Sequence, residues 1–213
     1  MNVLLTGASG SLGKEFAKQF KERNIKYYSH SKFKKSEDLS CICDLADPKI
    51  LSFVQNFIVE HNITCLVNNA AQYLNSDLNE IEDEKIIDLI NVNLIAPILL
   101  SKYLYSHLLA TNQAGKIINI NSIAGKQPNY LESVYCASKY GLSGFGASLS
   151  INQKKSKIQI IDCFIGGMKS EITKNRSNYA SLMEPSKISH FIVDLIESKE
   201  QYTVSSIDLR NNT

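Results

Sequence analysis

The chain has 213 residues, of which 44% are hydrophobic and 21% charged, and its formal net charge is +2. This composition is ordinary for a soluble globular domain, and the near balance of charge gives no indication of a nucleic-acid surface. The longest apolar stretch, 94–100, is far shorter than the ~20 residues of a membrane span and contains Pro97, so we expect no contact with a membrane.

The cysteines and histidines indicate neither disulfides nor metal ligation. The five cysteines are odd in number and lack Cys-x-x-Cys spacing, which favours reduced thiols in a cytoplasmic protein. The N-terminal residues lack a charged n-region, so we expect no secretory signal. The four histidines are dispersed without metal-ligand spacing, and we therefore expect no metal site and no chemical role for them.

The first motif is a glycine turn between a predicted strand, 2–6, and a predicted amphipathic helix. Glycines let the backbone approach a pyrophosphate, and the following helix N-terminus offers free N–H groups to it. The alternative is a turn that binds nothing. The candidate cofactor-binding residues of this segment are Gly7, Ser9, Gly10, Ser11, Leu12 and Gly13.

Polar residues follow each of the next three predicted strands. The strand at 25–29 leads to Ser31 and Lys32, and the strand 41–43 ends at Asp44 and Leu45. Only about ten residues join these two strands, which is little for the helix of a parallel crossover. A helix is predicted to begin at Asp47-Pro48, with Asp47 as N-cap, and to bury Ile50, Leu51, Val54, Phe57 and Ile58. The strand 65–67 leads to Asn69, Ala70 and Ala71.

The second half of the chain continues the alternation of helices and strands. A long helix is predicted over 82–109 with a bend at Pro97, then a strand over 116–121, a helix over 133–153 and a strand over 158–164. A turn with Gly166, Met168 and Ser170 follows, then a short polar segment, 171–183, a helix over 185–197 and a strand over 202–209. This order predicts one Rossmann-like, doubly wound α/β domain over 1–213, with about seven mainly parallel strands and helices on both faces. Ligands bind such sheets at the carboxyl ends of the strands.

A hydroxyl, a phenol and an ammonium stand at suggestive positions in that second half. Ser122 ends a strand and lies thirteen residues before Tyr135, and Lys139 follows Tyr135 by one helical turn. An ammonium beside a phenol stabilises phenolate, so we expect Lys139 to lower the pKa of Tyr135 from its usual ~10. Tyr135 would then be a proton donor usable near neutral pH.

These motifs together resemble the short-chain dehydrogenase/reductase family over nearly the whole chain. The resemblance implies that Tyr135 is the acid/base, that Ser122 hydrogen bonds to the substrate carbonyl, and that Lys139 also holds the nicotinamide ribose. It implies further that Asn93 holds a water in a proton relay. Asp44 would meet the adenine, Asn69 the adenosine side of the cofactor and Ser170 the carboxamide. The implied activity is transfer of a hydride between nicotinamide and a carbonyl or secondary alcohol.

Three features depart from the family pattern and leave alternatives open. Ser11 stands where a glycine is usual, and the spacing Gly7-x-x-Gly10-x-x-Gly13 favours a sugar-nucleotide reductase or epimerase as the runner-up. The connection between the second and third strands lacks a helix. Ile165 stands where the family usually has proline. A non-catalytic dinucleotide-binding sensor is a further alternative, which the presence of Asn93, Ser122, Tyr135 and Lys139 together disfavours.

The end of the second strand indicates the cofactor. It carries no acidic residue before Glu37, and Ser31 and Lys32 suit a 2′-phosphate, so we expect NADP(H) to be preferred over NAD(H). The expected partners are a small carbonyl or alcohol substrate and further copies of this chain, as a homodimer or homotetramer. The apolar residues expected to form that interface include Leu94, Ile98, Leu99, Leu104 and Leu108.

Overall fold

A computed structural model describes residues 1–32, 40–49, 51–151, 156–199 and 203–211. It contains one seven-stranded, all-parallel sheet with the strand order β3-β2-β1-β4-β5-β6-β7, which confirms the predicted doubly wound fold. The strands are β1 (Asn2–Leu5), β2 (Lys26–Ser31), β3 (Ser40–Ile42), β4 (Cys65–Asn68), β5 (Gly115–Ser122), β6 (Ile158–Ile165) and β7 (Ser206–Leu209).

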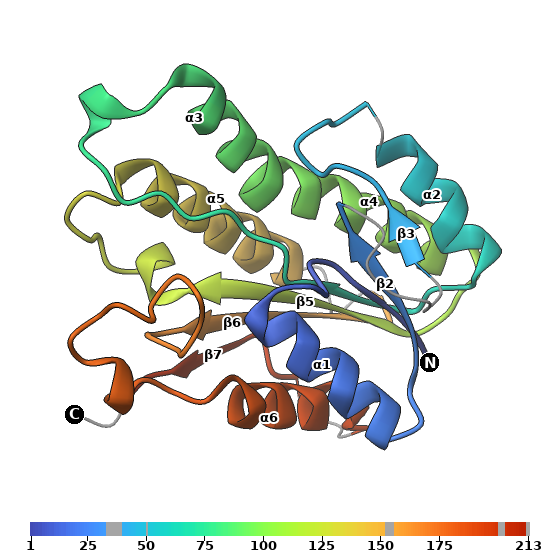
Figure 1. Ribbon diagram of the computed structural model, residues 1–213. Coiled ribbons are helices and arrows are strands. Elements are labelled where there is room, and N and C mark those ends of the chain that lie inside the picture. The colour runs from blue at the N-terminus through green and yellow to red at the C-terminus, as the bar shows by residue number, and fades with distance from the viewer. Residues whose placement is uncertain (33–39, 50, 152–155, 200–202, 212–213) are drawn as a thin grey trace.

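Helices cover both faces of the sheet (Figure 1). The helices α1 (Ser11–Glu22) and α6 (Pro185–Glu197) lie on one face. The other face carries α2 (Leu51–Glu60), α3 (Asp83–Ile90), α4 (Ala96–Ala110) and α5 (Ser133–Ser150). Short helical turns η1 (Leu78–Glu80), η3 (Ile123–Gly125) and η5 (Tyr179–Ser181) lie in the connections.

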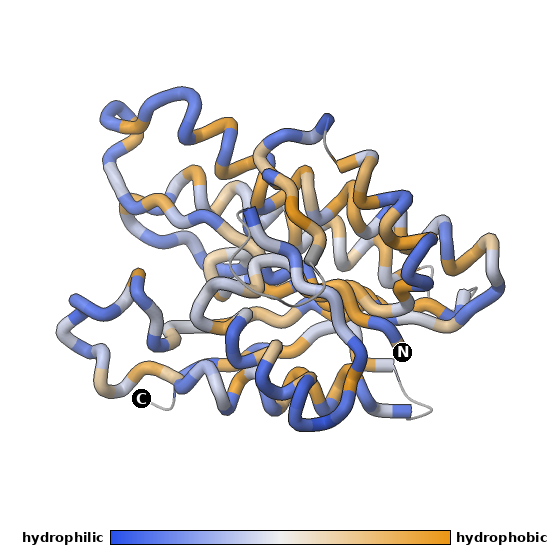
Figure 2. The backbone as a smooth tube through the Cα atoms, turned by 45° about the vertical axis from the view of Figure 1, so that its right-hand side comes forward, coloured by the Kyte–Doolittle hydropathy of each residue, from blue (hydrophilic) through white to orange (hydrophobic). Residues whose placement is uncertain are grey.

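The strands are apolar because both of their faces are buried. In β1, Val3 and Leu5 pack against the α1 and α6 side, while Leu4 packs against the α2 and α4 side. Each of these three side chains is at most 1% exposed. The central strands accordingly stand out as hydrophobic in Figure 2. Parallel strands enclosed between two helical layers require such continuous apolar runs rather than alternation.

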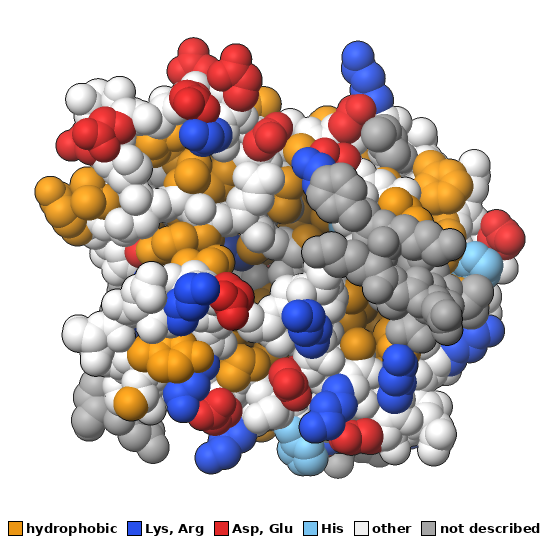
Figure 3. Space-filling model, in the orientation of Figure 1, with side chains coloured by type: hydrophobic (Ala, Val, Ile, Leu, Met, Phe, Trp, Pro, Cys, Tyr) orange, Lys and Arg blue, Asp and Glu red, His pale blue; other side chains and the backbone are white. Residues whose placement is uncertain are grey.

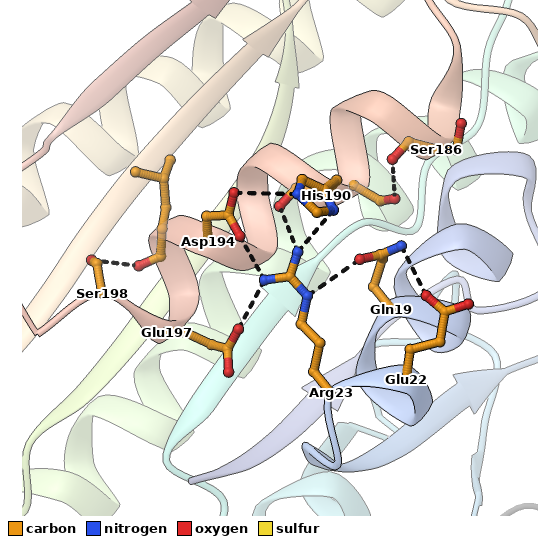
Figure 4. A network of polar contacts seen from close by, with 10 residues as sticks. Gln19, Glu22, Arg23, Ser186, His190, Asp194, Glu197 and Ser198 are labelled. Atoms are coloured by element: carbon orange, nitrogen blue, oxygen red, sulfur yellow. Dashed lines mark hydrogen bonds and ion pairs between the residues drawn. The ribbon is translucent and has the colours of Figure 1, made fainter.

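An arginine at the end of α1 joins the two helices on one face of the sheet. Arg23 Nη1 lies 2.6 Å from Asp194 Oδ1 and 2.9 Å from Glu197 Oε2, both on α6 (Figure 4). Gln19 and His190 also hydrogen bond to the guanidinium. A network of charged and polar side chains therefore links α1 to α6, in addition to the apolar contacts between them.

The predicted long helix is interrupted just before Pro97 rather than at it. A π-helical segment, η2 (Asn91–Ile95), separates α3 from α4, and Pro97 lies in the first turn of α4. Leu100, Leu104 and Leu108 are at most 1% exposed and pack on the sheet. The stretch Asp83–Ala110 is long and apolar enough to cross a membrane by length and composition alone. Of the most apolar window in this stretch, 39% is buried inside the fold.

Two other element boundaries differ from the sequence prediction. The helix α2 begins at Leu51, although Asp47 does accept a hydrogen bond from the Lys49 backbone N–H at 2.9 Å, as the predicted cap would. The last strand begins at Ser206 rather than at 202. The connection that was expected to lack a helix, and the expected burial of Ile50, lie outside the described residues.

Candidate active site

The glycine turn between β1 and α1 has a backbone that only glycine accommodates at two positions. Gly7 has a φ of +65°, and a Cβ built there would lie 2.7 Å from the Cα of Ala70. A Cβ on Gly13 would lie 2.2 Å from the carbonyl oxygen of Gly7. These close approaches fold the turn tightly over the end of β1. They leave room in front of the turn for a ligand.

The start of α1 fits a phosphate. Gly10 is the N-cap and makes no side-chain capping bond, and the first turn contains no acidic residue. The N–H groups of this turn therefore stay available, and the helix dipole favours an anion there. Ser11 stands in place of the usual glycine and is the first residue of α1. It lines a large cavity at the carboxyl ends of the strands. The turn thus has the shape and polarity that the pyrophosphate of a dinucleotide requires.

Two side chains that the sequence analysis missed brace this turn. The buried His30 accepts a hydrogen bond from the Gly7 N–H at its Nδ1 (3.4 Å), and its Nε2 lies 2.9 Å from the Cys43 carbonyl oxygen. Thr6 Oγ1 accepts hydrogen bonds from the backbone N–H groups of Asn69 and Ala70, at 2.9 and 3.0 Å. No sequence signal distinguishes His30 from any strand residue. Its role is structural, as the bond to the turn indicates.

The predicted adenosine-side residues lie together, but two of them pair with each other. Lys32 Nζ lies 2.7 Å from Asp44 Oδ2, and Asp44 Oδ1 accepts a hydrogen bond from the Ala46 N–H. Burial of Asp44 raises its pKa, but the Lys32 ammonium outweighs this and holds the pKa below its ordinary value. Ser31 and Leu45 line the same part of the cavity. A phosphate on Lys32 would therefore compete with the Asp44 carboxylate.

The residues after β4 form the wall next to the turn. The Asn69 amide donates to the carbonyl oxygens of Thr6 (2.9 Å) and Gly7 (3.1 Å), so its side chain holds the turn in place. Ala70 and Ala71 follow it and also line the cavity. The small side chains at these two positions keep the approach to the glycine turn open.

The hydroxyl, phenol and ammonium predicted from the sequence do come together at the ends of β5 and α5. The Ser122 hydroxyl lies close enough to the Tyr135 hydroxyl to lower the pKa of that phenol. Lys139 Nζ donates to the Ile120 carbonyl oxygen at 3.1 Å and lies 5.7 Å from the centre of the Tyr135 ring. All three side chains line the cavity that contains the glycine turn.

The expected lowering of the phenol pKa is wrong for this structure. Burial raises the pKa of Tyr135 to about 12, and the Ser122 hydrogen bond only partly opposes it. Burial likewise lowers the pKa of Lys139 to about 8. The cause is that both groups leave water, which favours their neutral forms, while the ammonium is directed at the Ile120 carbonyl. The phenol therefore holds its proton at neutral pH.

Asn93 lies behind the cavity rather than in its wall. Its Oδ1 accepts from the Gln72 N–H at 2.7 Å, and its Nδ2 lies 2.9 Å from the Gln72 carbonyl oxygen and 3.2 Å from Ser138 Oγ. The side chain is 1% exposed and sits in the π-helical segment η2. Its amide thus ties the loop after β4 to α5. The predicted water relay through Asn93 stays a prediction.

The turn after β6 completes the cavity on the side of β7. Gly166 donates its N–H to the Leu209 carbonyl oxygen at 2.8 Å, and the Ser170 N–H donates to Thr173 Oγ1 at 2.9 Å. Gly166, Met168 and Ser170, the predicted cofactor-binding residues of this turn, all line the cavity. Ile165, at the family's usual proline position, is the last residue of β6.

The sequence analysis also missed four polar residues on the wall beside Tyr135. They are brought together from three loops that follow β4, β5 and β6, so no local spacing reveals them. They are Tyr73, Asn129, Glu132 and Arg176.

One cavity of about 960 Å³ unites all these walls. It runs along the carboxyl ends of the strands, which Figure 1 places under the loops after β4, β5 and β6. Acidic and basic side chains are interspersed over this face of the molecule (Figure 3). Within the described residues, no group of three or more His, Cys, Asp or Glu side chains could hold a metal ion. The cavity brings hydroxyl, phenol and ammonium groups together beside the glycine turn.

Curated proteins of similar sequence are dehydrogenases and reductases. A family model described as short chain dehydrogenase matches residues 1–180. The chain is 29% identical over 195 residues to dehydrogenase/reductase SDR family member 7 of Mus musculus, covering 82% of this chain and 57% of that protein. It is 27% identical over 236 residues to 15-hydroxyprostaglandin dehydrogenase of Rattus norvegicus, whose name specifies NAD(+), covering 92% of this chain and 85% of that protein.

Solved structures share the fold over nearly the whole chain. A 4-hydroxyisoleucine dehydrogenase complexed with NADH superposes with a TM-score of 0.89 at 19% identity, covering 99% of this chain and 97% of that one. A metagenomic short-chain oxidoreductase in complex with NADP gives a TM-score of 0.83 at 24% identity, covering 100% and 98%. The match of the family model to most of the sequence shows that this chain belongs to the short-chain dehydrogenase/reductase family of NAD(P)-dependent oxidoreductases.

Proposed function

We propose that this protein reduces a carbonyl compound, or oxidises the corresponding alcohol, with Tyr135 as the acid/base. The observation that supports this most strongly is that Ser122, Tyr135 and Lys139 line the same cavity as the glycine turn, with Lys139 Nζ 5.7 Å from the centre of the Tyr135 ring. A protein that only binds a dinucleotide has no use for such a proton donor. The arrangement therefore favours an enzyme over the sensor alternative.

The cavity residues would divide the work as follows. The hydroxyls of Ser122 and Tyr135 both bind the substrate oxygen and stabilise the negative charge that develops on it. Tyr135 then passes its phenolic proton to that oxygen. Lys139, whose Nζ lies 5.7 Å from the centre of the Tyr135 ring, would hold a ribose hydroxyl of the cofactor. The bound nicotinamide supplies or accepts the hydride.

The phenolic oxygen is expected to be indispensable for turnover but not for folding. Tyr135→Phe should keep its melting temperature and its affinity for cofactor, and should lose at least about a hundredfold in kcat, the usual scale of lost acid/base catalysis. A matched control is Tyr130→Phe, because Tyr130 is 87% exposed and lies outside the cavity wall. Turnover is measured on a panel of carbonyl compounds with both reduced cofactors. Near-normal turnover by Tyr135→Phe would refute the mechanism.

We propose further that NADP(H) is preferred over NAD(H). Supporting this, β2 ends at Ser31, Lys32 follows it, and the strand carries no acidic side chain. The Asp44 carboxylate lies on the neighbouring strand end and is paired with Lys32, so its charge is partly neutralised. A 2′-phosphate, as a dianion, would draw Lys32 away from Asp44. The named relatives use either cofactor, so the preference rests on these residues.

This preference predicts a specific effect of one lysine. Lys32→Ala should weaken NADPH binding roughly ten- to a hundredfold, the scale of one charged contact, and should leave NADH binding nearly unchanged. Lys18→Ala is the control, because Lys18 on α1 is similarly exposed and lies outside the cavity wall. Titration of both cofactors against the three proteins decides the matter. Tighter binding of NADH than NADPH by the wild type would refute the preference. An unchanged NADPH affinity in Lys32→Ala would show that Lys32 does not cause it.

One observation favours a second candidate, a sugar-nucleotide reductase or epimerase. The turn keeps the spacing Gly7-x-x-Gly10-x-x-Gly13, with Ser11 as the first residue of α1. A nucleoside-diphosphate sugar in the same substrate panel separates the two candidates.

We propose that the protein is located in the cytoplasm, since all five cysteines are buried free thiols.

A further inference from the structure

A chain of polar contacts beside Tyr135 has no part in the proposed proton transfer. Tyr73 donates its hydroxyl hydrogen to Glu132 Oε1 at 2.6 Å, and Asn129 Nδ2 donates to Glu132 Oε2 at 2.9 Å. Arg176 Nη2 donates to the Tyr73 oxygen at 3.3 Å. The chain joins the loops after β4, β5 and β6, which meet at the same end of the sheet (Figure 1).

The two charged residues in this row of polar contacts, Glu132 and Arg176, differ in the hydrogen-bonding groups that they can offer a ligand. Glu132 is 7% exposed, and both of its oxygens already accept hydrogen bonds from neutral groups. Arg176 is exposed and lines the cavity, and a guanidinium carries five N–H donors. In the described part of the protein, no carboxylate oxygen lies within ion-pairing distance of Arg176, and the guanidinium donates one hydrogen bond, to the Tyr73 hydroxyl. The guanidinium therefore keeps donors free toward the cavity.

Tyr73 connects the guanidinium to the reacting groups, because it contacts both Arg176 and Tyr135. Its ring packs edge-to-face on the ring of Tyr135, with the centres 5.1 Å apart. A carboxylate such as Glu132 only accepts hydrogen bonds, so the Tyr73 hydrogen points at Glu132 and a lone pair is left for Arg176. Burial and the Glu132 hydrogen bond both raise the pKa of Tyr73, which keeps this phenol neutral. Tyr73 is thus a positioning residue and not a second acid.

We propose that Arg176 binds a carboxylate of the substrate, so that the enzyme interconverts an oxo acid and the corresponding hydroxy acid. This inference rests on the proposed function, because it places the carbonyl at Ser122 and Tyr135. A guanidinium matches a carboxylate through two parallel N–H···O bonds, which orient as well as attract the substrate. With its acid group on Arg176, a compound has its carbonyl a few carbon atoms away at the phenol.

The reaction in this assignment balances without a further reactant. In the reducing direction the carbonyl π bond breaks, the carbon gains a hydride from NAD(P)H, and the oxygen gains the Tyr135 proton. The products are the hydroxy acid, NAD(P)⁺ and a phenolate that recovers its proton from solvent. The carboxylate itself takes no part in bond making, so Arg176 contributes binding and orientation only.

The test compares 2-, 3-, 4- and 5-oxo acids with their methyl esters as substrates. Wild type should turn over at least one acid with a kcat/KM about ten- to a hundredfold above that of its ester, the scale of a charged hydrogen-bonded contact. Arg176→Gln should lose that advantage by lowering kcat/KM for the acid and not for the ester. Tyr73→Phe should raise KM for the acid while kcat stays near that of wild type. Lys174→Gln removes a positive charge from the same loop outside the cavity wall and should preserve the ratio.

Three results would overturn the assignment. Equal turnover of acids and esters by wild type would do so, as would an equal loss on both in Arg176→Gln. Loss of the acid preference in Arg210→Gln alone would move the site to Arg210, which also lines the cavity but contacts Asp208 and Gln127.

A binding measurement separates failure of this inference from failure of the proposed function. Hexanoate and hexanamide, which contain no reducible ketone, are titrated by ligand-observed NMR in the presence of NADP⁺. Wild type should bind hexanoate more tightly than hexanamide, and Arg176→Gln should bind both equally. If no carbonyl compound is reduced, the proposed function fails, and the hexanoate preference still decides whether Arg176 is an anion site. Equal binding of both probes by wild type would refute the inference whatever the turnover.

Discussion

Asp162 is a buried carboxylate in the middle of β6. It is 3% exposed, and its Oδ1 accepts a hydrogen bond from Asn119 Nδ2 on β5 at 2.8 Å. Asn119 in turn accepts from Asn68 on β4 at 2.9 Å, so a polar row crosses three strands between apolar layers. Burial outweighs the Asn119 hydrogen bond and raises the pKa of Asp162 to about 6.

This pKa makes stability depend on pH in a stated direction. Between about pH 4 and 6 the folded chain binds more protons at Asp162 than the unfolded chain, so the free energy of unfolding falls as pH rises through that window. The loss amounts to up to about 3 kcal/mol, from the ordinary 3.8 to about 6 at ~1.4 kcal/mol per pKa unit. Asp162→Asn should lack this slope in urea titrations at pH 4 to 7.5.

Asp208→Asn provides a control of opposite sign. Lys126 lowers the pKa of Asp208, so the stability that Asp208 contributes is lost as pH falls rather than as it rises. The effect should be small, because the side chain is 34% exposed and water screens the pair. Identical pH profiles of wild type and Asp162→Asn would show that Asp162 does not titrate in this range.

At the scale of elements, the apolar residues expected to form an interface between copies of the chain are only partly available for it. Leu104 and Leu108 of α4 are at most 1% exposed and pack on the sheet, so they are excluded from the predicted set. Exposed apolar side chains remain on the same layer, among them Ile87 on α3 and Tyr140 on α5, which are 58% and 44% exposed. These side chains keep the prediction of a homodimer or homotetramer open to test.

An assembly through this layer should respond to a charge placed on it. Light scattering at micromolar concentration should give a mass of at least about 48 kDa, twice the 23.8 kDa of one chain. Tyr140→Glu should lower that mass, because a carboxylate in an apolar interface costs several kcal/mol. Phe53→Glu on α2, where the side chain is 53% exposed, serves as the control. A mass of 23.8 kDa for wild type would decide for the monomer.

The order of the elements was predictable because each one carries a periodic apolar pattern. The helix α6 begins and ends where proline and the apolar spacing predict, at Pro185 and Glu197. The sequence predicted that the long helix would bend at Pro97, which is not where the structure interrupts it. Proline is tolerated in the first turn of a helix, and the interruption lies in the π-helical segment around the buried Asn93. That asparagine bonds to Gln72, twenty-one residues away, and no local pattern carries such information.

The same limit applies to the site. Ser122, Tyr135 and Lys139 could be predicted because a strand end and one helical turn fix their relation. The direction of the phenol pKa could not, because it depends on burial and on the carbonyl that Lys139 contacts. Tyr73 and Arg176 are 103 residues apart in the chain, and they come into contact only because the folded sheet brings their loops together.

The strand order of the sheet bears on how the chain folds while it is being synthesised. Along the sequence, β2 joins one edge of β1 and β3 joins β2, then β4 joins the other edge of β1, and β5, β6 and β7 follow outward one by one. No strand has to enter between two that are already paired. A chain that emerges N-terminus first can therefore complete the glycine turn after β1 and the strands beside it before Tyr135 and Lys139 have been synthesised, and each later described strand pairs with a free sheet edge.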